Sequence, residues 1–200
     1  MEVASVSNKK HIVFLYEALG TAMLIYAINM QFGQNFGQYG IGFMLFAWLL
    51  ICGPITGAHF NPAVTIGVYV SNKSWKKDTV MFFVMIAAQV FGALFGICLV
   101  WASLYNGTGK VETTSGGVPK SEMFVLLPAL PNVRASNAFQ IELMCTWFFV
   151  LINLLVKTQK TSPSSDGFLA CLTVALTLLA MACLAGPRSG GCLNPAIAIG

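Results

Sequence analysis

The sequence predicts an all-α membrane protein, built as an inverted-repeat helical bundle with two re-entrant half-helices. Three observations predict this class: the composition, five long apolar stretches and an internal repeat. Of the 200 residues, 56% are hydrophobic and only 9% carry a charge, and the mean hydropathy is +0.75. Soluble domains carry about 25% charged residues because their surface faces water. The composition therefore argues against a soluble enzyme, and the excess of apolar residues excludes a disordered chain.

Five apolar stretches are long enough to cross a bilayer, since a spanning helix needs about 20 such residues. They are Ile12–Met30, Tyr39–Thr56, Val80–Leu104, Ala138–Val156 and Phe168–Gly186. Two shorter pieces, Asn61–Val70 and Asn194–Gly200, each open with Asn-Pro and follow a Gly-Pro pair that predicts a turn. Short apolar segments beside full spans are typical of re-entrant half-helices.

The distribution of charge predicts the orientation of the spans. The net charge is +4 without a dense basic run, which indicates membrane topology and no nucleic-acid partner. With the N-terminus in the cytoplasm, seven basic residues face inward and four outward. The inward set is Lys9, Lys10, Lys73, Lys76, Lys77, Lys157 and Lys160, and the outward set is Lys110, Lys120, Arg134 and Arg188. The outward loop 105–137 also carries Asn106 in an Asn-Gly-Thr sequence, a candidate glycosylation site.

An internal repeat divides the chain into two related halves. Residues 53–67 match residues 186–200 at a constant offset of 133, with eight of fifteen positions identical. Glu17 and Glu142 also stand in matching Glu-x-x-x-Thr sequences. Because each repeat has three crossings, the two copies insert with opposite orientation. The prediction is one domain over residues 1–200, with repeat one at about 11–104 and a truncated repeat two at about 137–200.

The Asn-Pro starts predict the chemistry of the place where the half-helices meet. Asn is a favoured N-cap whose side-chain oxygen accepts backbone N–H groups, and Pro fits the first helical position. Capping is expected to leave the amide N–H₂ of Asn61 and Asn194 free to donate into a pore, beside two positive helix ends. Such a site repels cations and interrupts proton transfer along a water chain. The predicted pore motifs are Asn61, Pro62, Ala63, Asn194, Pro195 and Ala196.

These residues resemble the aquaporin, or major intrinsic protein, family. The resemblance lies in Thr56–Thr65, Asn194–Ala196, the Glu-x-x-x-Thr sequences at Glu17 and Glu142, and Gln89–Ala93. It covers nearly the whole chain and implies an aquaporin-like, right-handed bundle of six spans with two half-helices. It also implies one pore per protomer and a homotetramer in the lipid bilayer.

Two departures from the family pattern affect the expected fold and selectivity. The family's sixth span is missing from these 200 residues, so a fragment is expected, with a natural five-span protein as the alternative. Water-selective relatives place Arg directly after the second Asn-Pro-Ala, where this chain has Ile197. Transferred without gaps, the family's selectivity filter falls on Ile41, Ala182, Gly191 and Ile197. Such a ring would be wider and more apolar, which disfavours narrow water selectivity.

Two acidic residues and one histidine receive structural interpretations. Glu17 and Glu142 lie inside spans, where ionisable groups usually face the interior. Each is expected to accept N–H groups of the adjacent re-entrant loop, with proton relay as the alternative. His59 is expected to make a hydrogen bond within its loop, with metal binding or pH gating as the alternatives.

The remaining singled-out residues are interpreted as packing or surface groups. Gly92 and Gly96 are spaced for a close helix contact. Arg188 is interpreted as a solvated loop residue, with a place in the vestibule as the alternative. The cysteines are expected to be buried small hydrophobes, neither disulfides nor metal ligands. They are Cys52, Cys98, Cys145, Cys171, Cys183 and Cys192.

The predicted function is a passive transmembrane channel for water or small neutral solutes, with no cofactor and no metal. The apolar filter would admit glycerol, urea, ammonia or hydrogen peroxide. A channel-inactive structural or scaffold member of the same family is the alternative. A membrane enzyme is disfavoured, since the sequence has no Ser/His/Asp set, metal-spaced His/Glu cluster or phosphate-binding loop.

Overall fold

The computed structural model describes residues 9–30, 37–73, 75–104, 133–158, 161–162 and 164–199. Within this part of the chain, five helices are long and apolar enough to cross a membrane. They are α1 (Lys10–Met30), α2 (Gly37–Thr56), α4 (Trp75–Leu104), α5 (Ala135–Lys157) and α6 (Gly167–Ser189). Each long helix contains one predicted span and extends past at least one of its ends, so the five predicted spans are confirmed as helices.

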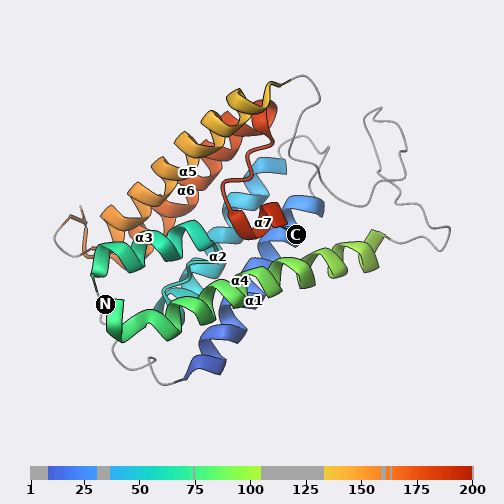
Figure 1. Cartoon of the computed structure of the whole chain (residues 1–200). Helices are drawn as coiled ribbons and strands as arrows, with labels where there is room; N and C mark the ends of the chain where they lie inside the picture. Colours follow the sequence, from blue (N-terminus) through green and yellow to red (C-terminus); the bar gives the residue numbers. More distant parts are fainter. Residues whose placement is uncertain are drawn as a thin grey trace.

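The two short helices are α3 (Pro62–Asn72) and α7 (Pro195–Ile199), which correspond to the predicted half-helices. α3 runs two residues beyond the predicted end and is closed by Lys73 in the left-handed conformation, with φ of 53°. In Figure 1, α3 and α7 lie between the pair α5/α6 and the pair α1/α4. The order of two long helices followed by a short one occurs twice along the chain.

Two glycines bring α1 and α4 into close contact. A Cβ atom placed on Gly92 would lie 2.2 Å from the main-chain oxygen of Ala18, and one on Gly96 would lie 2.7 Å from that of Ala22. Only the absence of a side chain allows such an approach, and small residues are the usual means of helix association in lipid. The close contact predicted from Gly-x-x-x-Gly is therefore confirmed, and it lies within the chain.

The two Gly-Pro pairs do not form turns, so that part of the sequence prediction is wrong. Pro54 lies inside α2 and Pro187 inside α6. A proline removes one backbone N–H near a helix end, but it does not end the helix by itself. The helices end where Gly57 and Gly190 take positive φ values of 86° and 97°. Glycine adopts this conformation at little cost and commonly terminates helices.

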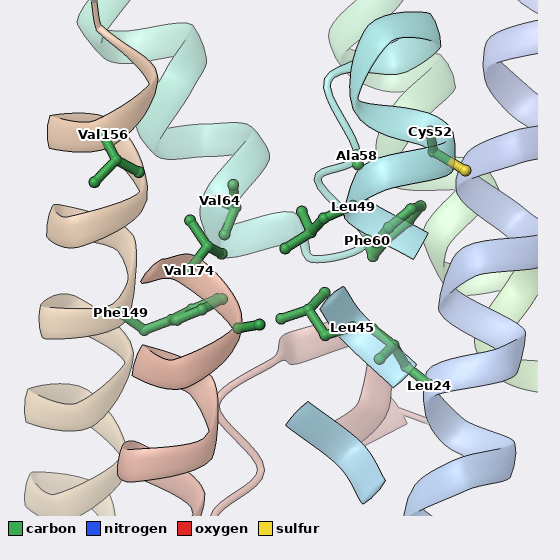
Figure 2. Packing of buried hydrophobic residues seen from close by; sticks show 11 residues of the cluster. Leu24, Leu45, Leu49, Cys52, Ala58, Phe60, Val64, Phe149, Val156 and Val174 are labelled. Atoms are coloured by element: carbon green, nitrogen blue, oxygen red, sulfur yellow. The ribbon is translucent and has the colours of Figure 1, made fainter. Parts of the chain in front are cut away.

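A buried apolar cluster connects α1, α2, α3, α5 and α6. Figure 2 shows Phe149 and Val156 of α5 pointing toward Val64 of α3 and Val174 of α6. The other buried members are Leu24, Leu45, Leu49, Cys52, Ala58, Phe60 and Ala175. Because lipid is as apolar as these side chains, close packing rather than exclusion of water holds the cluster together.

The cysteines are free thiols, but their burial differs from the prediction. Cys52 is buried, whereas Cys98 and Cys183 are exposed. The prediction assumed that an apolar side chain avoids the surface, which holds in water. On a spanning helix the surface faces lipid, so a small apolar side chain can lie there without cost.

Candidate functional site

The first residues of α3 and α7 meet inside the bundle. Asn61 and Asn194 are only 3% and 6% exposed. The Nδ2 atom of Asn61 donates a hydrogen bond of 2.9 Å to the main-chain oxygen of Leu193. In the same way, Nδ2 of Asn194 donates a hydrogen bond of 2.8 Å to the main-chain oxygen of Phe60. The two repeats are therefore joined by a reciprocal pair of hydrogen bonds.

This pair corrects the expectation that the asparagine amides are free. Each amide carries two N–H donors, and one of them binds the carbonyl of the opposite repeat. The sequence alone gave no sign of this, because the accepting residues Phe60 and Leu193 lie just before the other asparagine, more than 130 positions away. Each amide keeps a second N–H that is not needed for the link between repeats.

Both asparagines also cap the helix that they precede. Oδ1 of Asn61 accepts a hydrogen bond of 2.8 Å from the backbone N of Ala63, and Oδ1 of Asn194 accepts one of 3.0 Å from that of Ala196. Asn61 has the extended backbone that an N-cap requires, with φ of −155° and ψ of 119°. The prolines begin the helices, in the position where a missing N–H costs nothing.

The carbonyls that accept the asparagine amides belong to residues in left-handed backbone conformation. Phe60 has φ of 49° and Leu193 has φ of 53°. For residues other than glycine this conformation costs about 1–2 kcal/mol, and it persists where surrounding contacts fix it. Both side chains are almost completely buried. Packing and the two crossing hydrogen bonds therefore fix the same local geometry in both repeats.

Glu17 of α1 holds the loop that leads to Asn61. Its Oε1 atom accepts hydrogen bonds from the hydroxyl of Thr56 at 2.7 Å and the backbone N of His59 at 3.0 Å. Its Oε2 atom accepts from the backbone N of Phe60 at 2.8 Å and from Nε2 of Gln89 at 2.9 Å. Glu17 is 0% exposed. Four donors thus compensate the burial of one carboxylate, as a buried charge requires.

Glu142 of α5 makes the equivalent contacts in the second repeat. It accepts hydrogen bonds from the Ser189 hydroxyl, from the backbone N of Cys192 at 3.1 Å and from that of Leu193 at 2.9 Å. Unlike Glu17, it is only partly buried. Both carboxylates therefore accept N–H groups of the adjacent loop, which fixes the carbonyls that bind the asparagines.

A second polar network supports the start of α3. The Thr65 hydroxyl lies 3.1 Å from the main-chain oxygen of Asn61, and Gln89 of α4 donates to that hydroxyl at 2.9 Å. Nδ1 of His59 lies 3.1 Å from the same hydroxyl. Thr65 and Gln89 are almost completely buried. The role of Thr65 was missed from sequence, although a Thr one turn after an N-cap can reach the backbone of that cap.

Two of the four predicted filter residues, Gly191 and Ala182, lie close together. Gly191 has φ of 64°, and a Cβ atom on it would lie 3.4 Å from the main-chain oxygen of Ala182. Ile197 of α7 packs against the buried cluster that Ile25, Ala93 and Ala196 form. All three predicted positions are partly buried.

Ile41, the fourth predicted filter residue, lies on α2 and is also partly buried. The next residue, Gly42, is in contact with α6, since a Cβ atom on it would lie 3.1 Å from Cβ of Leu179. The predicted set therefore draws on α2, α6, the loop before α7 and α7 itself.

Arg188, another residue singled out from the sequence, lies away from these contacts. Arg188 is exposed, but it belongs to the last turn of α6 rather than to a loop, and its Nη1 atom donates 2.8 Å to the main-chain oxygen of Leu184. The helix continues to Ser189 because Pro187 does not end it. Asn106, the candidate glycosylation site, lies outside the described residues.

Two residues at the end of α5 were missed by the sequence reasoning. Nζ of Lys157 donates 2.7 Å to the main-chain oxygen of Gly57, at the beginning of the loop before Asn61. Asn153, one turn earlier, is 2% exposed, and its Oδ1 atom has no hydrogen-bond partner within the described residues. A polar residue in an apolar stretch was the available signal for Asn153. In the described part, no group of three His, Cys, Asp or Glu side chains could hold a metal ion.

Comparisons with known proteins bear on the whole chain. A family model described as major intrinsic protein matches residues 3–200. Aquaglyceroporin-2 of Rhizophagus irregularis is 31% identical over 162 residues, which are 78% of this chain and 49% of that protein. The glycerol uptake facilitator protein of Escherichia coli strain K12 is 29% identical over 196 residues, covering 90% of this chain and 68% of that protein. Aquaporin NIP1-2 of Arabidopsis thaliana is 30% identical over 194 residues, covering 92% of this chain and 61% of that protein.

A solved structure shares the fold. The aquaglyceroporin from Plasmodium falciparum aligns with a TM-score of 0.75 at 24% identity, over 96% of this chain and 79% of that one. The chain spans 49% to 68% of the lengths of the three sequence relatives. Because the family model covers almost every residue and the described part has five apolar spanning helices, the chain is an integral multi-pass membrane protein that belongs to the major intrinsic protein family.

Proposed function

We propose that this protein is a passive channel for water and small neutral solutes, with no chemical step and no cofactor. The observation that supports this most is the reciprocal bonding of Asn61 and Asn194 to the opposite repeat. Interrupted helices and polar side chains are costly inside a membrane, and they occur where they line a cavity or a path for solutes. Two such interruptions meeting at one point favour a path through the bundle.

The paired asparagines would supply the central selectivity of this path. The second N–H of each amide can donate to the oxygen of a passing solute. The N-terminal end of the 11-residue helix α3 adds a partial positive charge at the same point. Cations would be repelled there, while a neutral molecule with an acceptor oxygen would be held briefly. We therefore infer a preference for uncharged, hydrogen-bonding solutes.

The proposed filter of Ile41, Ala182, Gly191 and Ile197 extends the solute range beyond water. None of these side chains carries a charge or a hydrogen-bonding group, so the constriction would reject solutes mainly by size. The similarity to a protein named glycerol uptake facilitator and to two proteins named aquaglyceroporin supports this proposal. Glycerol, urea, ammonia and hydrogen peroxide are the proposed candidates.

The proposed assembly is a homotetramer of single domains, each with two inverted repeats and a cytoplasmic N-terminus. Large apolar side chains are exposed on the spanning helices, among them Phe43 and Phe139 at 69% and Phe83 at 62%. Lipid or a neighbouring protomer would cover such a surface. The excess of basic residues on the connections assigned to the cytoplasm supports the orientation.

Stopped-flow light scattering on proteoliposomes tests the function. Osmotic gradients of an impermeant solute measure water flux, and gradients of glycerol, urea and ammonia measure solute flux. We expect water and at least one solute to cross faster than in protein-free vesicles. Incorporated, folded protein that raises no flux for any solute would overturn the channel and favour the structural or scaffold member.

A further inference from the structure

Asn153 is a buried polar side chain whose place the helical packing does not explain. It lies within the membrane-spanning helix α5, is 2% exposed, and its Oδ1 atom has no hydrogen-bond partner within the described residues. Buried polar atoms in proteins nearly always bind another protein group or an ordered water. In a membrane the cost of an unpaired acceptor is not relieved by solvent from outside. A small hydrogen-bonding molecule inside the bundle would supply the partner.

The position of Asn153 on α5 shows that it faces the interior. Phe149 and Val156 lie four residues before it and three residues after it, so the three side chains share one face of the helix. Both neighbours belong to the buried cluster. Figure 2 shows them pointing toward Val64 of α3 and Val174 of α6. The Asn153 side chain therefore lies on the face of α5 that packs against the buried cluster, away from lipid.

The same face of α5 continues to the loop that leads to Asn61. Nζ of Lys157, one turn after Asn153, donates a hydrogen bond of 2.7 Å to the main-chain oxygen of Gly57. α3 lies against this part of α5, since a Cβ atom on Gly67 would lie 2.6 Å from Cγ1 of Val150. Asn153 thus lies on the side of α5 that is packed against α3, between the apolar side chains of Phe149 and Val156.

We propose that Asn153 lines the solute path on the α3 side of the paired asparagines and binds a small neutral solute through its carboxamide. This inference rests on the proposed channel function. A carboxamide can accept and donate hydrogen bonds without carrying charge. It suits water and solutes with hydroxyl or amide groups, and it gives no fixed site for an ion. A polyol, which must replace several bonds to water on entering a narrow path, gains more from it than water does.

The test substitutes Asn153→Leu, which keeps a similar volume and removes the polar group. The matched control is Asn29→Leu, since Asn29 is also inside a spanning helix but has a partner, the main-chain oxygen of Ile25 at 2.9 Å. In proteoliposomes, we expect Asn153→Leu to lower the ratio of glycerol to water permeability by about threefold to tenfold, the effect of one net hydrogen bond. Asn29→Leu is expected to keep the ratio of the parent protein.

Thermal stability separates this role from a structural one. Removing an unpaired acceptor from a dry site should raise the unfolding temperature and leave permeation unchanged. That combination would overturn the proposal. If Asn153→Leu does not fold, Asn153→Ala and Asn153→Ser replace it. A higher glycerol-to-water ratio in Asn153→Ser than in Asn153→Ala supports the proposal, and equal ratios overturn it.

The outcome for the parent protein distinguishes this inference from the proposed function. A parent protein that raises no flux for water, glycerol, urea or ammonia would overturn both. A parent protein that conducts, with an Asn153→Leu variant of unchanged ratio, would overturn only the role of Asn153.

Discussion

The side-chain amide of Asn194 lies 2.8 Å from the main-chain oxygen of Phe60, although 134 positions separate the two residues in the chain. The equivalent bond runs from Asn61 to Leu193, so each repeat donates to the other. Because the same amides also cap α3 and α7, the position of one half-helix depends on the other. This dependence makes the pair a unit whose members should not contribute independently to stability.

Substituting either asparagine therefore tests the coupling between the repeats. Asn194→Leu removes one cap and one crossing hydrogen bond and leaves the Phe60 carbonyl without its donor. We expect a loss of about 2–4 kcal/mol in the free energy of unfolding. Asn61→Leu should cost a similar amount, and the double variant should cost less than the sum. Thermal unfolding in detergent measures these changes.

The control for the asparagine pair is Asn137→Leu, since Asn137 is exposed near the start of α5. Substitution of an exposed residue outside such a network usually changes stability by about 0.5 kcal/mol or less. Additive losses in the Asn61 and Asn194 variants would show that the two half-helices are held separately, contrary to the crossing bonds.

The carboxylates of Glu17 and Glu142 are expected to contribute different amounts to the free energy of unfolding, although their positions in the two repeats are equivalent. Glu17→Gln replaces one of the two carboxylate oxygens by an NH₂ group, which is a donor. Four donors bind the carboxylate, two on each oxygen, so the new NH₂ group would face two of them. Glu17 is 0% exposed, so water cannot relieve the conflict. We expect a loss of about 2–4 kcal/mol, typical of hydrogen bonds to a buried charge. Glu142→Gln should cost less, because Glu142 is partly exposed and can exchange a lost contact for water.

Unfolding temperatures of Glu17→Gln and Glu142→Gln, measured side by side, check this order. The matched control is Asp166→Asn. Asp166 caps α6 by accepting an exposed hydrogen bond of 2.8 Å from the backbone N of Phe168, and asparagine caps equally well. Equal losses for Glu17→Gln and Glu142→Gln would contradict the argument from burial.

The sequence predicted the spans and the half-helix starts because both depend on local properties. Twenty apolar residues define a spanning helix wherever they occur, and Asn-Pro defines a capped start. The end of α2 at Thr56 was predicted, whereas α6 continues to Ser189, three residues beyond the predicted end at Gly186, because Pro187 lies inside its last turn. In both helices the residue after the end has a positive φ, Gly57 after α2 and Gly190 after α6.

Contacts between segments far apart in the chain could not be predicted from the sequence. The bond from Asn61 to Leu193, and the lack of a partner for Oδ1 of Asn153 within the described residues, depend on how α3, α5 and α7 pack. Hydropathy does not report which side of a uniformly apolar helix faces a neighbour, since every side is apolar. The repeat was the one long-range signal, because it placed two like segments in opposite orientation.

The contact between α1 and α4 predicts a contrast between two glycines. A Cβ atom on Gly92 would lie 2.2 Å from the main-chain oxygen of Ala18, whereas one on Gly53 would meet nothing within 4 Å. Gly92→Ala should therefore force the helices apart and cost about 3 kcal/mol or more. Gly53→Ala should leave stability unchanged or raise it by up to about 1 kcal/mol, since alanine favours the helix.

Size-exclusion profiles and unfolding temperatures of Gly92→Ala and Gly53→Ala check this contrast. A Gly92→Ala protein with the elution volume and stability of the parent would show that α1 and α4 can separate without cost. That result would contradict the close contact at Ala18.

The proposed filter predicts that a charge at Ile197 changes solute selectivity. Ile197 is partly buried against the cluster of Ile25, Ala93 and Ala196, so Ile197→Arg places a long donor side chain within reach of the proposed constriction. A guanidinium there would narrow the path and offer fixed hydrogen-bond donors to water. We expect the ratio of glycerol to water permeability to fall by about tenfold or more, a change that corresponds to about 1.4 kcal/mol between the two barriers.

The control for Ile197→Arg is Ile199→Arg, two residues further along α7, where the side chain is 63% exposed. An arginine at that position adds the same charge and volume without a place among the buried contacts, so permeability should stay near the parent value. The two variants must be compared at equal protein incorporation, because permeability scales with the number of channels. If Ile197→Arg conducts glycerol and water in the parent ratio, the side chain after the second Asn-Pro-Ala does not border the narrowest part of the path, and the wide apolar filter has to be abandoned.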